Sequence, residues 1–176
     1  MKQLILKVQQ AFDDAAGTFT EYGLPTVAHI DKYRGQIMNP ELFETYNLPA
    51  IFYQIRITWE KRGKLYSGVG TIDFHVQQDA TWEVSSISTN QAEGLKQIDF
   101  LALVRAVLDD LSSEVTGKLQ RSTETSVETD ITPYDVLSYT ISITDNNLNL
   151  REKLVLTAGD GNLAITGKLK TDSEDS

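Results

Sequence analysis

The chain has 176 residues, no cysteine and a formal net charge of -9, from 25 acidic and 16 basic residues. A chain of this length fits one domain, which buries about 70% of its unfolded surface without cross-links. The lack of cysteine excludes disulfides, thiolate zinc sites and thiol nucleophiles, and it is compatible with a reducing cytoplasm. An acidic chain repels phosphate backbones, so we expect no non-specific binding to nucleic acid.

The sequence also shows no segment of membrane-spanning character. No stretch approaches the ~18 consecutive apolar residues that a spanning helix needs. The apolar patch at the N-terminus is short and is interrupted by Lys7, Gln9 and Gln10, so we expect no secretory signal.

The first predicted element is a helix over residues 2–16, which Gly17 is expected to end. Its apolar residues recur at helical spacing and form one stripe: Leu4, Ile5, Val8, Phe12, Ala15 and Ala16. Such a stripe indicates a helix that faces the core, with packing on a neighbouring subunit as the alternative.

A strand over residues 26–33 is expected next, followed by a loop from Arg34 to Leu48. Inside the loop, Asn39-Pro40-Glu41 has the pattern of an N-cap, a proline at the first helical position and an acidic residue in the first turn. We therefore expect one short helical turn there.

A long β-hairpin, from about Pro49 to Val76, is the predicted centre of the fold. Large apolar residues alternate with smaller or more polar ones along its first strand: Ile51, Tyr53, Ile55, Ile57 and Trp59. This period of two predicts a half-buried strand. The polar segment from Lys61 to Lys64 contains Gly63 and is expected to form the turn.

The return strand of this hairpin is expected from Leu65 to Val76. It carries Ile72, Phe74 and Val76 on one face. Gly68 and Gly70 lie inside it, where glycine indicates a bulge, a sharp bend or the close approach of another backbone.

A second helix is expected from Gln91 to about Glu114. Asn90 and Glu93 have the spacing of a capping box, while Gly94 leaves the start of the regular helix open. Its apolar stripe consists of Leu95, Ile98, Leu101, Val104, Leu108 and Leu111, widened by Phe100, Leu103 and Val107. This is the most apolar helix, so it should lie across the sheet.

The remaining pattern is that of strands. Residues 118–129 are polar and rich in Ser and Thr, as expected of an edge strand. Residues 136–144 alternate strictly, with their apolar positions at Leu137, Tyr139, Ile141 and Ile143. Residues 150–157 and 162–169 flank Ala158-Gly159-Asp160-Gly161 and form a second candidate hairpin.

The order of helix, strands, helix and strands predicts an α+β fold. We expect a mainly antiparallel β-sheet with the long hairpin at its centre and two main helices packed on the sheet. The sequence has no internal repeat and no linker, so residues 1–170 are expected to form a single domain. The small, charged residues 171–176 are expected to form a disordered tail.

The two histidines, His29 and His75, are the first candidates for chemistry, the second with Asp73 nearby. A metal site needs three or four ligands in a fixed geometry, and the two histidines lack a metal-binding spacing. We interpret them as exposed or partly buried strand residues. We therefore predict no metal and no cofactor.

Adjacent carboxylates occur at Asp13/Asp14 and at Asp109/Asp110, both in predicted helices. Neighbouring side chains on a helix diverge by ~100°, so the members of each pair do not share a proton. We interpret both pairs as solvated helix faces.

Loop motifs give no clear site either. Residues 145–149 lack the glycine and glutamate of a calcium loop, and Asp160-Gly161-Asn162 is better explained as a hairpin turn. The sequence contains neither a nucleophile elbow nor a phosphate-binding loop; the nearest segment, Ser67 to Gly70, lies inside a predicted strand. We therefore expect no enzyme.

Four residues of the long hairpin are candidates for contact with another molecule: Tyr53, Trp59, Arg62 and Tyr66. Aromatic side chains on strands mostly pack in a core. The other two interpretations are a contact between subunits and a platform for a ligand.

Several short segments occur in a characteristic order over about residues 25–146. They are His29-Ile30-Asp31-Lys32-Tyr33 with Gln36, Leu48-Pro49-Ala50-Ile51-Phe52, Gly68 to Val76 ending in Phe74-His75-Val76, Leu119-Gln120-Arg121, and Asp130 followed by Leu137 to Thr144 with Asp145. In order and spacing they resemble the tail-terminator or tail-completion proteins, minor tail proteins that cap the tail tube of long-tailed phages and prophages. Tyr33 departs from the expected tryptophan, and the segment after Asn146 has no counterpart.

This resemblance implies a virion structural protein without an active site or a cofactor. It implies a helix-flanked sheet and assembly into a homo-oligomeric ring, usually of six subunits. The expected partners are the tail-tube protein and the head-completion or connector protein, with no nucleic acid and no membrane. The expected location is the host cytoplasm during assembly and the virion tail afterwards.

Within this interpretation the hairpin is an arm that contacts a neighbouring subunit. Tyr53, Trp59, Arg62 and Tyr66 are the contact residues that it predicts. The alternative is a small soluble binding or adaptor domain that uses the aromatic hairpin as a platform for a protein or a ligand.

Overall fold

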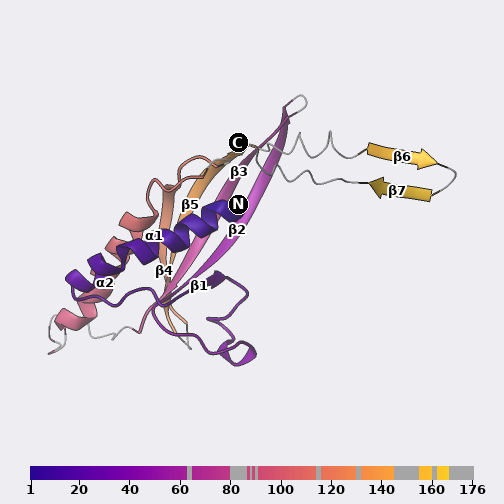
Figure 1. Cartoon of the computed structure of the whole chain (residues 1–176). Helices are drawn as coiled ribbons and strands as arrows, with labels where there is room; N and C mark the ends of the chain where they lie inside the picture. Colours follow the sequence, from indigo (N-terminus) through magenta and orange to yellow (C-terminus); the bar gives the residue numbers. More distant parts are fainter. Residues whose placement is uncertain are drawn as a thin grey trace, which may run out of the picture.

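The structure is a computed structural model, and it describes residues 1–62, 65–79, 87, 89, 91–113, 116–129, 132–144, 155–159 and 162–166. This part of the chain has a mixed α+β fold, which confirms the predicted class (Figure 1). A five-stranded, mostly antiparallel sheet has the strand order β1-β2-β3-β5-β4. No helix in the described ranges is long and apolar enough to cross a membrane.

The elements of the main unit follow one another from the N-terminus. The helices are α1 (Lys2–Glu21), the short 3-10 helix η1 (Pro40–Leu42) and α2 (Gln91–Leu108). The strands are β1 (His29–Lys32), β2 (Ala50–Arg62), β3 (Leu65–Gln77), β4 (Gln120–Val127) and β5 (Tyr134–Thr144).

Helix α1 continues through Gly17 to Glu21, so the prediction that Gly17 ends it is wrong. The extra turn buries Phe19, whose ring lies 5.4 Å from the ring of Phe100 and 6.4 Å from that of Phe12. Burying a phenylalanine is worth about 1.5–3 kcal/mol, which exceeds the ~1 kcal/mol that an internal glycine costs.

The true end of α1 is set by Gly23, which has a φ of 67°. Its backbone N–H donates to Thr20 O at 3.0 Å, and the N–H of Leu24 donates to Phe19 O at 2.9 Å. These two bonds form a Schellman motif, in which a left-handed glycine closes the helix. Leu24 and Phe19 are both buried, as the hydrophobic contact of that motif requires.

Helix α2 ends at Leu108, earlier than predicted, because Asp110 adopts a φ of 65° and turns the chain back. Its buried face also differs from the predicted stripe, because Leu95 and Ile98 are exposed, whereas Phe100, which the prediction placed at the margin of the stripe, is buried. Phe100 and Ile98 lie on opposite sides of a helix, so only one of them can face the core. The larger apolar side chain is buried, against Phe19.

The sheet is built on β2 and β3, each 13 residues long, which pair antiparallel along their whole length. β3 also pairs antiparallel with β5, which pairs with β4 at one edge. β4 is thus the polar edge strand that the sequence predicts. At the other edge β1, which is shorter than predicted, pairs in parallel with Ala50 to Tyr53.

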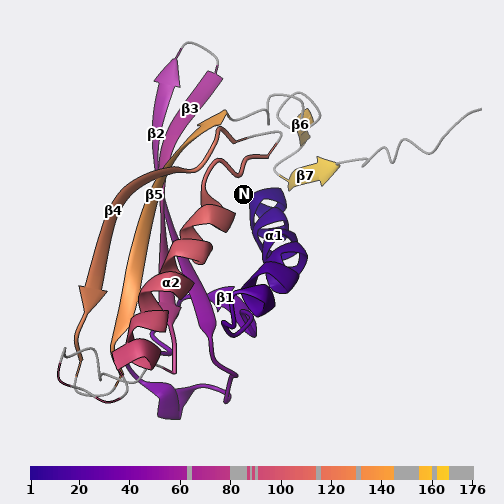
Figure 2. The ribbon, with the colours of Figure 1, turned by 90° about the vertical axis from the view of Figure 1, so that its left-hand side faces the viewer.

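One face of the sheet belongs to the main hydrophobic core, which also includes side chains of both helices. Figure 2 shows α1 and α2 on the same side of the sheet. The predicted alternation on β3 and β5 is confirmed by these buried residues: Ile72, Phe74, Val76, Leu137, Tyr139, Ile141 and Ile143.

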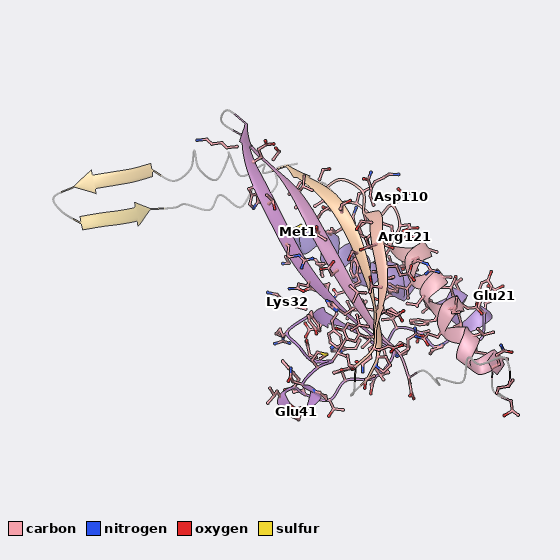
Figure 3. The ribbon with its side chains drawn as sticks, turned by 180° about the vertical axis from the view of Figure 1, so that it is seen from behind. Met1, Glu21, Lys32, Glu41, Asp110 and Arg121 are labelled. Atoms are coloured by element: carbon pink, nitrogen blue, oxygen red, sulfur yellow. The ribbon has the colours of Figure 1, made fainter. Side chains whose placement is uncertain are left out.

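The opposite face of the sheet is covered at one end by the segment between β1 and β2. A second cluster there consists of Ile37, Ala50 and Phe52, against which Tyr33, Tyr46, Leu48 and Tyr134 pack. The predicted helical turn is η1 of this segment, and Figure 3 labels its Glu41. The sheet is therefore buried on both faces at this end, which we call the closed end.

The second candidate hairpin corresponds to a separate two-stranded sheet of β6 (Val155–Gly159) and β7 (Asn162–Thr166). The two strands pair antiparallel, with Gly159 opposite Asn162. Residues 63–64, 145–149 and 160–161 and the tail 171–176 lie outside the described residues. The expectation of a single domain over residues 1–170 stays a prediction.

Candidate functional site

The far ends of β2 and β3 extend beyond both helices, as Figures 1 and 2 show. We call this part of the sheet the open end. A cleft of about 540 Å³ is lined there by Thr58, Trp59, Glu60, Ser67, Gly68, Val69, Ser142 and Ile143. Trp59 is 47% exposed and Val69 is 64% exposed. Two large apolar side chains therefore reach the surface on neighbouring strands.

Trp59 and Gly68 are cross-strand partners at the open end. A Cβ atom added to Gly68 would lie 2.9 Å from Trp59 Cε3 and 3.1 Å from Ile57 Cγ2. The indole ring therefore covers the glycine, and any side chain at position 68 would displace it. Glycine fits at this position because it has no side chain, which leaves room for the indole ring of the neighbouring strand.

Gly70 makes room in the same way, but for side chains of β5 instead of β2. A Cβ atom there would lie 3.0 Å from Ile141 Cγ1 of β5. Pairing of β3 with both neighbours continues through Gly68 and Gly70, so the bulge, one of the three alternatives that the glycines indicated, is absent from this strand. Side chains, rather than another backbone, make the close approach.

The structure does not bring the four predicted contact residues together. Tyr53 is partly buried and packs against the main core, and burial raises the pKa of its phenol. Six residues separate it from Trp59, or about 20 Å along a strand. The backbones of Arg62 and Tyr66 pair with Leu65 and Lys61, whereas the side chains at 62 and 66 are not described.

His75 lies at the closed end and is buried, with 8% of its surface exposed. Its ring stacks on Tyr33, with centroids 3.9 Å apart and planes at 11°, and lies 5.6 Å from the ring of Tyr134. Neither ring nitrogen has a hydrogen-bond partner. Burial lowers the pKa of His75, and the nearby Arg56 lowers it further while Asp73 opposes the shift.

Asp73 has structural partners of its own. Arg56 Nη2 lies 2.6 Å from Asp73 Oδ2, and Ser138 Oγ donates to Asp73 Oδ1 at 2.6 Å. The carboxylate therefore joins three strands across the second face of the sheet. Within the described ranges, no group of three or more His, Cys, Asp or Glu residues is placed to hold a metal ion.

The acidic pair Asp109/Asp110 follows α2, so the prediction that it forms a solvated helix face is wrong. Asp109 is ion-paired with Arg121 and accepts a hydrogen bond from Tyr139 Oη at 3.1 Å. Asp110 lies 3.2 Å from Lys118 Nζ. Burial raises the pKa of Tyr139, and the nearby Asp109 raises it further. The pair fixes the start of β4 to the end of α2.

A second cleft, of about 380 Å³, lies beside β1. It is lined by His29, Asp31, Arg34, Gln36, Leu42, Phe43, Glu44, Thr45, Tyr46 and Phe52. His29 stacks on Tyr46 with ring centroids 5.6 Å apart, and Arg34 forms an ion pair with Asp31 at 2.7 Å. The side chains of Arg34 and Asp31 are 59% and 36% exposed, so the pair contributes little to stability.

Several residues that carry the family resemblance have packing roles in the structure. Gln36 is buried; it accepts from Arg34 N–H at 2.6 Å and donates to Lys32 O at 2.8 Å, which closes the turn after β1. Tyr33 covers His75, and Leu119 is buried in the main core. The contact between Tyr33, His75 and Tyr134 was not predicted, because no local pattern links three separate segments.

Comparison of the sequence with protein-family models finds no matching family, and comparison with curated proteins finds no matching relative. The resemblance to tail terminators therefore rests on the quoted segments alone.

Proposed function

We propose that this protein is a phage or prophage tail terminator or tail-completion protein, which caps the tail tube as a ring and joins it to the head connector. The order and spacing of the resembling segments support the family. The open end of the sheet is the structural support for the proposal, because its exposed apolar side chains are available for contact with another molecule.

The apolar surface of the open end is the main observation. Trp59 lies outside the main core and is 47% exposed, and Val69, on the opposite face of the sheet, is 64% exposed. Aromatic residues at the surface of assembly proteins are commonly buried by a partner. In this proposal β2 and β3 form one long hairpin arm, the helices pack on the sheet behind it, and the arm contacts the neighbouring subunit.

The two carboxylates Asp73 and Asp109, which lie near a histidine and a tyrosine, have structural partners. Asp73 is paired with Arg56 and Ser138, and Asp109 with Arg121 and Tyr139. Each carboxylate holds strands or a helix end in place. This use of polar groups suits a protein that acts by its shape and surfaces.

The proposal is tested by imaging the purified protein with tail tubes of the phage or prophage that encodes it. We expect closed rings at one end of each tube. Trp59→Ala should abolish the rings and leave the circular dichroism spectrum unchanged. Leu42→Ala is the matched control, because Leu42 is 72% exposed and lies on η1, away from the open end. A protein that stays monomeric and binds no tube would contradict the proposal.

The second candidate is a binding or adaptor domain, favoured by the 540 Å³ cleft beside Trp59. A ligand in that cleft would contact the indole ring and quench its fluorescence. The measurement uses a Trp82→Phe background, which leaves Trp59 as the single tryptophan of the chain. Saturable quenching without ring formation would favour this candidate over the first.

A further inference from the structure

The outer side of β2 is paired with β1 over only part of its length. β1 pairs with Ala50 to Tyr53, and β2 continues to Arg62. In the described part of the chain, no strand pairs with this side of β2 from Gln54 onward. A row of backbone groups is therefore left without a strand partner. Such an edge readily pairs with another strand.

The direction of these backbone groups follows from two hydrogen bonds at the paired end. Tyr33 N–H donates to Tyr53 O, and Ala28 N–H donates to Pro49 O, each at 2.9 Å. The carbonyls of odd-numbered residues of β2 therefore point away from β3, toward the β1 side. Because backbone groups alternate in direction along a strand, the N–H and C=O groups of Ile55, Ile57 and Trp59 point the same way. Even-numbered residues face β3 instead.

We propose that this edge pairs antiparallel with the same edge of a second copy of the chain, about a two-fold axis at Ile57. Ile57 then lies opposite Ile57 of the second copy, and Ile55 lies opposite its Trp59. Both copies offer outward backbone groups at these positions. The contact is self-complementary, as a two-fold interface requires.

The side chains support this register. On the core-facing side, the pairs are two isoleucines and an isoleucine with a tryptophan, types that favour cross-strand contact. On the other side, Arg56 lies opposite Thr58 of the second copy, so no like charges meet there. Moving the axis to Trp59 would place Arg56 opposite Arg62. Moving it to Ile55 would set residues 57–60 of the second copy opposite Ala50 to Tyr53, which β1 already pairs, whereas an axis at Ile57 brings only Lys61 and Arg62 to the end of β1.

The opposite edge of the sheet is a poorer partner. From Gln120 to Ser126, β4 carries only polar and charged residues. Pairing β2 with β4 of a second copy would set Ile57 and Trp59 beside these residues. The β2 edge of a second copy is therefore a better partner for this edge than β4 is. This inference goes beyond the proposed function, because a ring uses heterologous contacts, and the two-fold pair describes the protein away from a tail.

Cysteine cross-linking tests the register directly, because the natural chain has no cysteine. Under mild oxidation, Ile57→Cys alone should form a disulfide-linked dimer on a non-reducing gel. Arg56→Cys and Thr58→Cys should cross-link efficiently only when the two variants are mixed. Val69→Cys is the control, because Val69 is 64% exposed but lies on β3, away from the edge.

The pairing is contradicted if Ile57→Cys cross-links no better than Val69→Cys. Cross-linking of Ile57→Cys chiefly to a Ser126→Cys variant would show that β4 is the partner and would also overturn it. Neither result bears on ring formation at a tube, so failure of the two-fold pair and failure of the proposed function are distinguishable.

Light scattering with a backbone variant supplies a second measurement. Ile57→Pro removes one outward N–H and leaves the hydrogen bonds between β2 and β3 in place, so the mass in solution should fall by half. Ile57→Val should keep the dimer. A wild-type protein that is monomeric at every concentration would overturn the proposal, whether or not the proline variant folds.

Discussion

The two ends of the β2–β3 pair share one unbroken ladder and differ in what covers them. At the closed end, Phe52 and Phe74 point to opposite faces and both are fully buried. At the open end, Trp59 and Val69 point to opposite faces and both are exposed. The comparison shows that backbone pairing is uniform along these strands, whereas the burial that stabilises them is concentrated at one end.

The largest expected effect is at the closed end. Phe74→Ala should lower the free energy of unfolding by about 3–5 kcal/mol, because it leaves a cavity in the main core beside Tyr139. Denaturant unfolding followed by circular dichroism measures the loss. A loss below about 1 kcal/mol would show that the closed end is not where stability is concentrated.

A smaller loss is expected from overpacking the open end. Gly68→Ala should lower the free energy of unfolding by about 1–3 kcal/mol, because the new Cβ would lie 2.9 Å from the Trp59 ring. In a Trp59→Ala background the same change should cost much less. A double-mutant cycle by denaturant unfolding measures the difference. Equal costs in both backgrounds would mean that the indole is not the obstacle.

Acidification should weaken the closed end through His75. Its pKa in the folded state lies below the ordinary value of 6.5, so the unfolded chain binds the proton more readily. Stability is then fully present above pH 6.5 and falls as the pH drops toward the folded pKa, by at most about 1.4 kcal/mol per pH unit. Unfolding at pH 7.5 to 5 measures this slope. His75→Leu should reduce it, and His29→Gln should retain it.

The smallest effect on stability is expected from Trp59→Ala. Trp59 is 47% exposed, so the loss should be about 1 kcal/mol, below the ~1.5–3 kcal/mol of a fully buried side chain. Its effect on assembly should be complete. Unfolding and tube-binding measurements on the same preparation separate the two. A loss as large as that of Phe74→Ala would place Trp59 in the core and remove the contrast between the two ends.

Much of the sheet could be predicted from the sequence because half-buried strands leave a period of two. The alternation from Leu137 to Ile143 predicts a buried face of β5, and the structure confirms it. The helices were predicted less accurately, since partners elsewhere in the chain decide their bounds and faces. Phe19 extends α1 past Gly17, and its contact with Phe100 selects which side of α2 is buried.

The candidate site could be predicted only in part. The pattern identifies Trp59 as an aromatic strand residue, but its exposure depends on where the helices end. Its fit over Gly68 depends on register, which no single strand reveals. The burial of His75 was missed because an irregular segment covers it, through Tyr33. An irregular segment has no periodic pattern of apolar residues, so its contacts cannot be predicted from the sequence.

The contact between Trp59 and Gly68 also predicts how related sequences should vary. A large aromatic residue at one position requires the smallest residue at the other, because the two share a single volume above the strand pair. Homologues with a side chain at position 68 should therefore have a smaller residue at position 59. The two positions should change together in an alignment, whatever the rest of the strand does.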